Sequence, residues 1–137
     1  MLQTPFCECF VIFVFCKCIV VSLKLNYHLF ETTGHNDGVN CLVVSPDCRE
    51  IFSGSYDGTV RRWLVQTGQC LHVYQVHSNT VCCVALLPNG SIASGSSDGI
   101  IKIWNSLTGE CLQTLKGNNG YVSGITVCSN GDLVGFS

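Results

Sequence analysis

Residues 92–104, IASGSSDGIIKIW, decide the fold because they repeat residues 51–63, IFSGSYDGTVRRW. The two stretches share Ser, Gly, Asp, Gly and Trp at the same spacing, and each position in the second lies 41 residues after its counterpart in the first. Asp-Gly between two β-rich runs is a strong short-range signal for a β-hairpin. We therefore expect two copies of one strand–turn–strand unit.

The repeat extends on both sides of this hairpin. Strand-forming pairs at Leu29-Phe30, Leu71-His72 and Leu112-Gln113 lead to Gly34-His35, Val76-His77 and Gly117-Asn118, and a further strand is expected to open at Val39, Val81 and Val122. Turn-forming residues follow each of these strands at 45–47, 88–90 and 129–131. Each unit is thus predicted to contain four short antiparallel strands, with a period typical of propeller blades.

Composition excludes several classes of protein. The chain has 137 residues, of which 47% are hydrophobic and only 12% charged, so it is not a disordered chain. Its net charge of −2 lacks the basic excess expected of a nucleic-acid-binding domain. We therefore expect no nucleic-acid partner.

Eleven cysteines would suggest a disulfide framework in a short secreted protein. Here several of them occupy equivalent strand positions, as Cys70 does with Cys111 and Cys41 with Cys83. Free cysteine in a strand behaves as a small buried hydrophobic residue. This pattern favours a reducing compartment, and we expect a cytoplasmic location, with the nucleus as the alternative.

The amino-terminal residues 1–28 form an apolar, Cys-rich segment outside the repeat, and residues 29–137 form the repeat region. A membrane anchor at residues 6–25 is one alternative, but Lys17 lies near its centre and its Val, Ile and Phe content favours strands. The pairs Cys7-x-Cys9 and Cys16-x-Cys18 have the wrong spacing for a zinc site. The segment could also be foreign to the natural repeat array.

The order Gly-His, Ser-Gly-Ser-x-Asp-Gly, a strand ending in Trp, and then Thr-Gly resembles the WD-repeat family. The resemblance covers about residues 29–137 and implies an all-β fold, a partial β-propeller of four-stranded antiparallel blades. Two full units and an incomplete third are present. Leu64 and Asn105 stand where the family usually has Asp after Trp, and the third unit has Asn118 in place of His and Gly135 in place of Ser.

Ser, His and Asp at recurrent spacing could indicate a hydrolase triad. A catalytic centre has no reason to occur once per repeat, whereas every blade must pair its own buried polar groups. The resemblance implies that these residues form a structural hydrogen-bond network with the Trp indole in each unit: His35, Ser53, Asp57 and Trp63, then His77, Ser94, Asp98 and Trp104. We therefore expect no enzyme activity, no cofactor and no metal.

The resemblance further implies a scaffold for protein–protein interaction, with loops and turns sharing one rim. The candidate partner-binding residues are Asn36, Asp37, Tyr56, Arg62, Ser78, Asn79 and Ser97. Tyr56 is the best of them, because an exposed aromatic at a turn is a suitable interface anchor. Arg62 could reach a partner or cover apolar surface with its stem.

About two and a third blades are too few to bury their own faces, since repeat arrays need about three or more units. We therefore expect a fragment of a longer propeller protein, or a chain that must assemble with further blades or with itself. The alternatives are a membrane-tethered repeat module and, more weakly, a Ser/His/Asp hydrolase.

Overall fold

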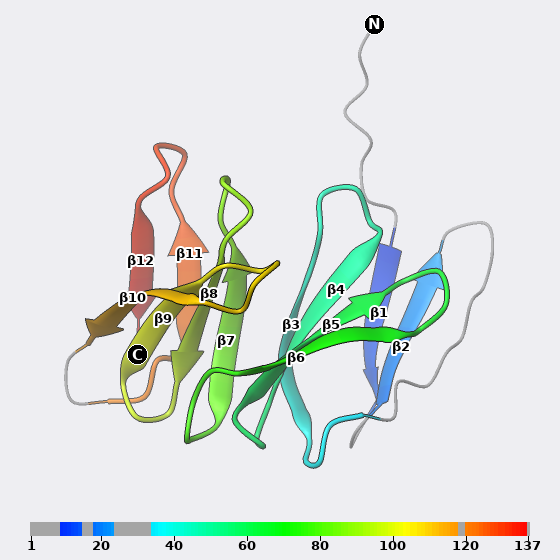
Figure 1. The fold of residues 1–137 in the computed structure, drawn as a ribbon, viewed down its shortest axis with the longest axis horizontal. Coiled ribbons are helices and arrows are strands. Elements are labelled where there is room, and N and C mark those ends of the chain that lie inside the picture. The colour runs from blue at the N-terminus through cyan, green and yellow to red at the C-terminus, as the bar shows by residue number, and fades with distance from the viewer. Residues whose placement is uncertain (1–8, 15–17, 24–33, 118–119, 137) are drawn as a thin grey trace, which may run out of the picture.

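The computed structural model describes the backbone of residues 9–14, 18–23, 34–117 and 120–136, and side chains from residue 34 onward. It contains two four-stranded antiparallel sheets that stand next to each other (Figure 1). Blade 1 consists of β3 (Val39–Val44), β4 (Glu50–Ser55), β5 (Thr59–Leu64) and β6 (Cys70–Gln75), and blade 2 of β7 (Val81–Leu86), β8 (Ile92–Ser96), β9 (Ile100–Trp104) and β10 (Cys111–Lys116). Strands follow one another in sequence order within each sheet, as the repeat predicts.

Two smaller sheets complete the described strands. β1 (Cys9–Val14) pairs with β2 (Cys18–Leu23), and β11 (Gly124–Val127) pairs with β12 (Leu133–Phe136), each pair being antiparallel. The expectation that a strand opens at Val122 is wrong, because β11 begins two residues later. Val122 N–H instead donates to Ser96 O at 3.0 Å, which ties the third unit to blade 2.

The Asp-Gly dipeptides form the predicted hairpin turns. Gly58 and Gly99 have φ of +82° and +81°, a left-handed conformation that favours glycine. Their N–H groups donate to Ser55 O at 3.2 Å and Ser96 O at 3.1 Å, which closes both turns in the same way. The hairpin prediction is therefore confirmed in both blades.

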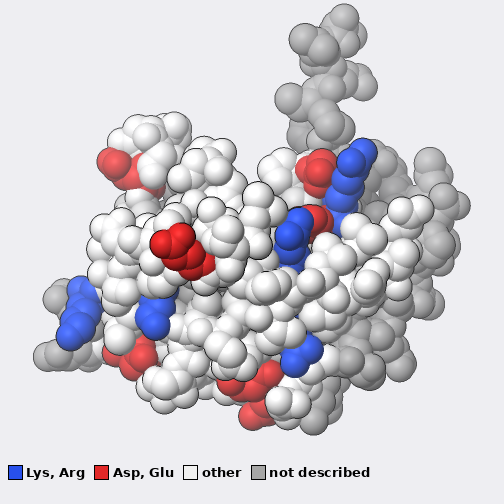
Figure 2. Space-filling model, viewed as in Figure 1, with Lys and Arg blue, Asp and Glu red and all other residues white. Residues whose placement is uncertain are grey.

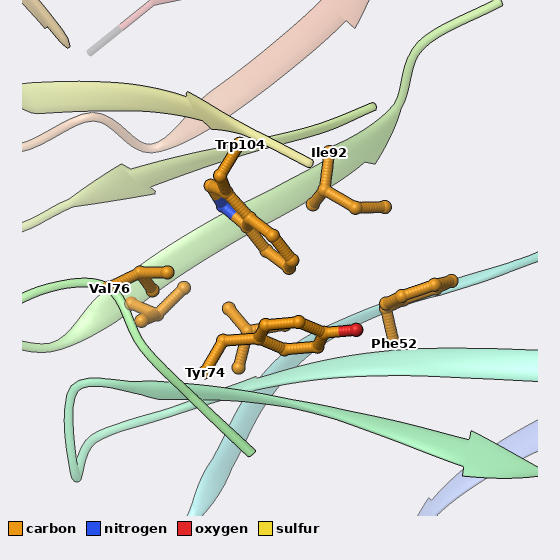
Figure 3. Packing of buried hydrophobic residues seen from close by; sticks show 7 residues of the cluster. Phe52, Tyr74, Val76, Ile92 and Trp104 are labelled. Atoms are coloured by element: carbon orange, nitrogen blue, oxygen red, sulfur yellow. The ribbon is translucent and has the colours of Figure 1, made fainter. Parts of the chain in front are cut away.

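The core between the blades is built by side chains from both sheets (Figure 3). Trp104 of blade 2 is fully buried and packs on Tyr74 of blade 1, with ring centroids 4.3 Å apart. Phe52 and Val76 of blade 1 and Ile92 of blade 2 belong to the same cluster. The Trp that ends the third strand of blade 2 therefore fills the seam between the two sheets.

Glycine of the Ser-Gly-Ser motif lets one blade approach the next. A Cβ on Gly54 would lie 2.5 Å from Cys41 Sγ and 2.6 Å from Val81 Cγ1, so only glycine fits there. A Cβ on Gly95 would likewise lie 2.6 Å from Val122 Cγ1. Val81, which opens β7, and Val122, which lies two residues before β11, thus sit directly on this motif.

The cysteine prediction is confirmed at some positions and wrong at others. Cys83 is buried, which raises the pKa of its thiol to about 11, and burial also raises the pKa of half-buried Cys41. Cys111 is exposed because it lies on β10, the outermost strand of blade 2. Cys48, which follows β3, is disulfide-bonded.

The amino-terminal expectations fall partly outside the described residues. The strand preference of the apolar run agrees with β1 and β2, while the boundary at residues 28 and 29 lies in a stretch that is not described. Among the residues that the structure describes, no helix is long and apolar enough to cross a membrane.

Candidate functional site

A chain of buried hydrogen bonds crosses blade 1 from the indole of Trp63 to the carboxylate of Asp57. Trp63 Nε1–H donates to Ser53 Oγ at 2.8 Å, and His35 Nε2 lies 2.7 Å from the same hydroxyl oxygen. The indole can only donate, so the Ser53 hydroxyl proton is assigned to the bond with His35 Nε2. The His35 proton then lies on Nδ1 and is donated to Asp57 Oδ2 at 3.0 Å.

Asp57 accepts hydrogen bonds from three residues. Besides His35, the Thr59 hydroxyl donates at 2.6 Å and the Thr59 backbone N–H at 2.9 Å to Oδ1, and Asn36 N–H donates at 3.0 Å to Oδ2. Burial raises the pKa of Asp57, but these hydrogen bonds outweigh it and hold that pKa at about 2. The carboxylate is therefore ionised at neutral pH and fixes the loop before β3 on the β4–β5 turn.

The imidazoles of His35 and His77 both titrate below their usual range. Burial is the largest cause of the lowered pKa of His35 and opposes the raising effect of Asp57. Burial also dominates at His77, where the Lys102 ammonium adds a further lowering effect. Both rings are therefore neutral at neutral pH, which agrees with the tautomer assigned above.

Blade 2 repeats only the Trp–Ser–His part of this series of hydrogen bonds. Trp104 Nε1–H donates to Ser94 Oγ at 3.1 Å, and His77 Nε2 lies 2.9 Å from that hydroxyl. His77 Nδ1 is buried and has no hydrogen-bond partner among the described residues. Asp98 is exposed and accepts from Ile100 N–H at 3.0 Å.

The predicted place of Asp98 in the second network therefore needs correction. In blade 1 the Thr59 hydroxyl lies between Asp57 and His35, 2.6 Å from the carboxylate and 3.2 Å from Nδ1. Blade 2 has Ile100 at the equivalent position, and a methyl-bearing side chain cannot bridge the two groups. Asp98 consequently caps its own turn and makes no hydrogen bond to the histidine.

Blade 1 places Ser53, His35 and Asp57 in the order of a hydrolase triad, yet the arrangement does not fit catalysis. Ser53 has no exposed surface, and its oxygen already accepts the Trp63 indole proton. A nucleophilic hydroxyl must reach a substrate carbonyl, which a fully buried one does not. The geometry is that of an internal brace between the loop, β4 and β5.

The brace holds a rim of exposed residues at one end of the blades. Tyr56 N–H donates to Gly38 O at 3.0 Å and His77 N–H donates to Gly58 O at 3.2 Å, so each loop is joined to a hairpin turn. Six of the seven candidate partner-binding residues are exposed along this rim: Asn36, Asp37, Tyr56, Ser78, Asn79 and Ser97. The Tyr56 side chain is 54% exposed and is the largest apolar group among them.

Arg62 lies apart from this rim and has a partner within its own blade. Its Nε–H donates to Glu50 Oε2 at 2.9 Å, and a second bond joins its terminal nitrogen to Glu50 Oε1. Both residues line a hollow of about 300 Å³ toward the opposite end of the blades, with Phe52 and Leu86. The guanidinium is thus engaged in a bidentate ion pair across two strands.

Thr59 and the second serine of the motif were not singled out from the sequence. Ser55 Oγ–H donates to Gly38 O at 2.8 Å while its oxygen accepts from Asp57 N–H at 3.1 Å. Its counterpart Ser96 accepts from Asp98 N–H at 3.4 Å. The recurrence of this serine in both repeats was the available signal, and the Thr59-to-Ile100 difference was the signal that the two networks differ.

Within the part of the chain that the structure describes, no group of His, Cys, Asp and Glu is arranged to hold a metal ion. The pairs Cys7 and Cys9, and Cys16 and Cys18, lie outside the residues whose side chains are described.

Comparison with known proteins finds WD-repeat proteins by sequence and by structure. The family model for the WD domain, G-beta repeat, matches residues 26–63 and 68–105. F-box/WD repeat-containing protein 10 of Mus musculus is 38% identical over 59 residues, which are 43% of this chain and 6% of that protein. U3 small nucleolar RNA-interacting protein 2 of Mus musculus is 37% identical over 68 residues, which are 42% of this chain and 14% of that protein.

The solved WD40 β-propeller domain of Doa1 superposes with a TM-score of 0.81 at 29% identity, covering 94% of this chain and 43% of that one. The chain therefore spans less than half the length of each of these three proteins.

Proposed function

The chain belongs to the WD-repeat family, a family of scaffolds that are in general not catalytic, and from this premise we propose that it binds partner proteins through the rim that carries Tyr56. Rim residues project from loops and hairpin turns, while the strands are used up in packing. The proposed role is that of a non-catalytic interaction module within a larger assembly.

One observation carries the proposal: the side chains of the rim are exposed, while hydrogen bonds to the blades hold its backbone in place. Asn36 N–H and Tyr56 N–H are each held by a hydrogen bond of 3.0 Å, to Asp57 and Gly38 respectively. A loop that is ordered before binding loses less conformational entropy when a partner docks. An exposed aromatic in such a setting is the residue type that dominates interface energies.

Charge supports a protein partner over a nucleic acid. On the face seen in Figure 2, basic side chains lie singly and acidic side chains lie among them. Nucleic-acid binding usually needs a clustered basic patch. One relative carries a small nucleolar RNA in its name, so a nucleic-acid partner is the alternative outcome of the experiment below.

The experiment places a photo-crosslinking phenylalanine analogue at position 56 in the full chain and, as the matched control, at position 107. Leu107 is 73% exposed on the turn between β9 and β10, at the opposite end of the blades. Crosslinked species are identified by mass spectrometry, and binding of the purified partner is then measured calorimetrically.

The proposal predicts a defined protein crosslinked at position 56 and not at position 107, and a Tyr56→Ala variant that binds it at least tenfold more weakly. Equal crosslinking at both positions, or an unchanged affinity of the Tyr56→Ala variant, would show that the rim is not the surface that binds the partner. A nucleic acid as the main crosslinked species would replace the protein partner with the alternative.

We also propose that the two blades work as part of a longer propeller or together with a second chain. Val134 and Phe136 on β12 are 45% and 56% exposed, and repeat units of this kind bury such surface against a neighbour. We propose a reducing location, cytoplasmic or nuclear, on the free thiols of Cys41 and Cys83, and the disulfide at Cys48 is the observation that speaks against it. Light scattering of the isolated chain tests the assembly, and a compact, soluble monomer would contradict it.

A further inference from the structure

The hollow of about 300 Å³ that Arg62 and Glu50 line lies between blades 1 and 2. Blade 1 contributes mainly residues of β4 and β5, and blade 2 contributes the end of β7 and the turns at 89–91 and 105–107. The volume lies at the lower end of the range for small-molecule sites and equals that of roughly ten water molecules. The hollow is therefore large enough for a small organic molecule.

Hydrogen bonds between the two blades hold the walls of the hollow in place. The Tyr74 hydroxyl of blade 1 donates to Ser106 O, and Ser106 Oγ–H donates to Gly90 O at 2.9 Å. Figure 3 shows the Tyr74 hydroxyl directed toward Phe52, which also lines the hollow. Because β4 and β5 are each paired on both sides, they offer no free edge to which an extended peptide could add. The hollow is thus formed in advance and suits a compact ligand.

The Arg62–Glu50 ion pair in the wall is not part of the repeat. The residues 41 positions later are Ile103 and Ser91, and blade 2 has the same strand order without such a pair. The bidentate contact lets Glu50 cancel the charge of the guanidinium, and the other described residues that line the hollow are uncharged. A charged group that entered the hollow would lose its water without gaining a counter-ion. The wall therefore favours a neutral ligand.

Two asparagines at the hollow keep their N–H groups available. Asn89 Oδ1 accepts from Ser91 N–H at 2.9 Å, and Asn105 Oδ1 accepts from the N–H groups of Leu107 and Thr108 at 2.8 and 3.1 Å. Both carboxamide oxygens are thus engaged with the backbone, whereas no described residue accepts a hydrogen bond from either Nδ2 group. The capacity that remains on these two side chains is that of a donor, which matches a carbonyl oxygen.

We propose that the hollow binds a small neutral molecule that has an apolar body and carbonyl oxygens, such as an amide or an ester. The carbonyl oxygens accept from the Nδ2–H groups of Asn89 and Asn105, and the apolar body packs on Phe52, Leu86 and Leu107. Leu107 is 73% exposed, so covering it removes apolar surface from water. The site lies at the opposite end of the blades from the protein-binding rim and does not depend on it.

The probe for the test is N-acetyl-leucinamide, a neutral molecule with an apolar side chain and a carbonyl oxygen on either side of it. Its binding to the full chain is measured by NMR titration, beside N-acetyl-leucine, which carries a carboxylate in place of the terminal amide. We expect saturable binding of the amide with a Kd on the order of 1 mM, which is the strength that a molecule of this size can reach. The carboxylate should bind at least about tenfold more weakly.

Two Asn→Asp variants locate the site. Asn105→Asp keeps an acceptor for the two backbone N–H groups of its turn and removes the donors, so the turn is preserved and binding of the amide should weaken by about tenfold or more. Asn130→Asp makes the same change in the turn between β11 and β12, where Asn130 Oδ1 accepts from Asp132 N–H at 3.0 Å. Asn130 does not line the hollow, so this control should bind the amide as the wild type does.

A Glu50→Gln variant tests the charge balance of the wall. Glutamine keeps the shape of the side chain and one acceptor for Arg62 but leaves the guanidinium charge uncancelled. The preference should therefore reverse, with N-acetyl-leucine bound more tightly than the amide and about tenfold more tightly than by the wild type. Circular dichroism confirms that each variant is folded.

Several results would overturn the proposal: no binding of the amide, equal binding of amide and carboxylate by the wild type, equal losses for the two Asn→Asp variants, or an unchanged preference in Glu50→Gln. The last probe is the longer peptide acetyl-Ala-Leu-Ala-amide, which should bind no more tightly than N-acetyl-leucinamide. A gain of more than about tenfold for this peptide would overturn the compact ligand in favour of a peptide segment as the occupant.

Discussion

Replacing Asp57 by alanine should destabilise the protein far more than the same change at Asp98. Asp57 has a side chain only 9% exposed and receives hydrogen bonds from His35, Thr59 and Asn36. Asn36 is exposed and can turn to water. The His35 Nδ1–H and the Thr59 hydroxyl are buried, and without the carboxylate they are left with only the 3.2 Å contact to each other, while His35 Nε2 keeps its bond to Ser53.

Leaving a buried hydrogen-bond donor without an acceptor costs about 1–3 kcal/mol. The remaining contact between His35 and Thr59 keeps the total loss of stability within that range. Asp98 is exposed and its one acceptor role, for Ile100 N–H, can be taken over by water. We therefore expect a loss of about 2 kcal/mol for Asp57→Ala and less than about 0.5 kcal/mol for Asp98→Ala. The sequence repeat alone would predict equal losses.

Urea unfolding of the full chain measures the difference, with tryptophan fluorescence and far-UV circular dichroism as two probes of one transition. The pH dependence gives a second readout. Because the pKa of Asp57 is lowered to about 2 from 3.8, the stability it contributes is present above about pH 4 and is lost as the pH falls towards 2. The gap between wild type and Asp57→Ala should close over that interval. Equal losses for the two variants, or a gap that persists at pH 2, would refute this account of the network.

Three further changes test the same physical picture. Ile100→Thr supplies blade 2 with the missing hydroxyl beside His77 and should add about 0.5–1.5 kcal/mol to the free energy of unfolding, whereas no gain would argue against the bridging role. Burial lowers the folded-state pKa of His35 and His77, so the unfolded chain takes up protons first as the pH falls. The free energy of unfolding should therefore decrease below pH 6.5, and less steeply in a His77→Gln variant. A flat stability profile between pH 7 and 5 would contradict this. Gly54→Ala should cost about 1–3 kcal/mol in thermal or urea unfolding because its Cβ meets Val81 at 2.6 Å, and an unchanged midpoint would mean that the blades are not packed as described.

The repeat in residues 51–63 and 92–104 was enough to predict the strand order and the hairpins. Asp-Gly turns and strand periodicity depend on residues that are close in sequence, so they can be predicted without knowing the tertiary contacts. The contacts of Trp, Ser and His in each unit were predicted only through the resemblance to the WD-repeat family, and they are present in both blades. The opening of β11 at Gly124 was missed because Val122 is drawn into a hydrogen bond with blade 2.

Only the tertiary structure decided which polar groups meet and which surfaces remain open. Thr59 and Ile100 occupy the same place in two similar stretches. Thr59 contacts both Asp57 and the buried His35, whereas with Ile100 in that place Nδ1 of His77 has no hydrogen-bond partner among the described residues. Likewise, Leu115 and Leu133 look like ordinary strand residues in the sequence, and only packing shows that they line a cavity. A repeat determines the position of each residue along its own strand, whereas contacts between strands and blades depend on side chains that are distant in sequence.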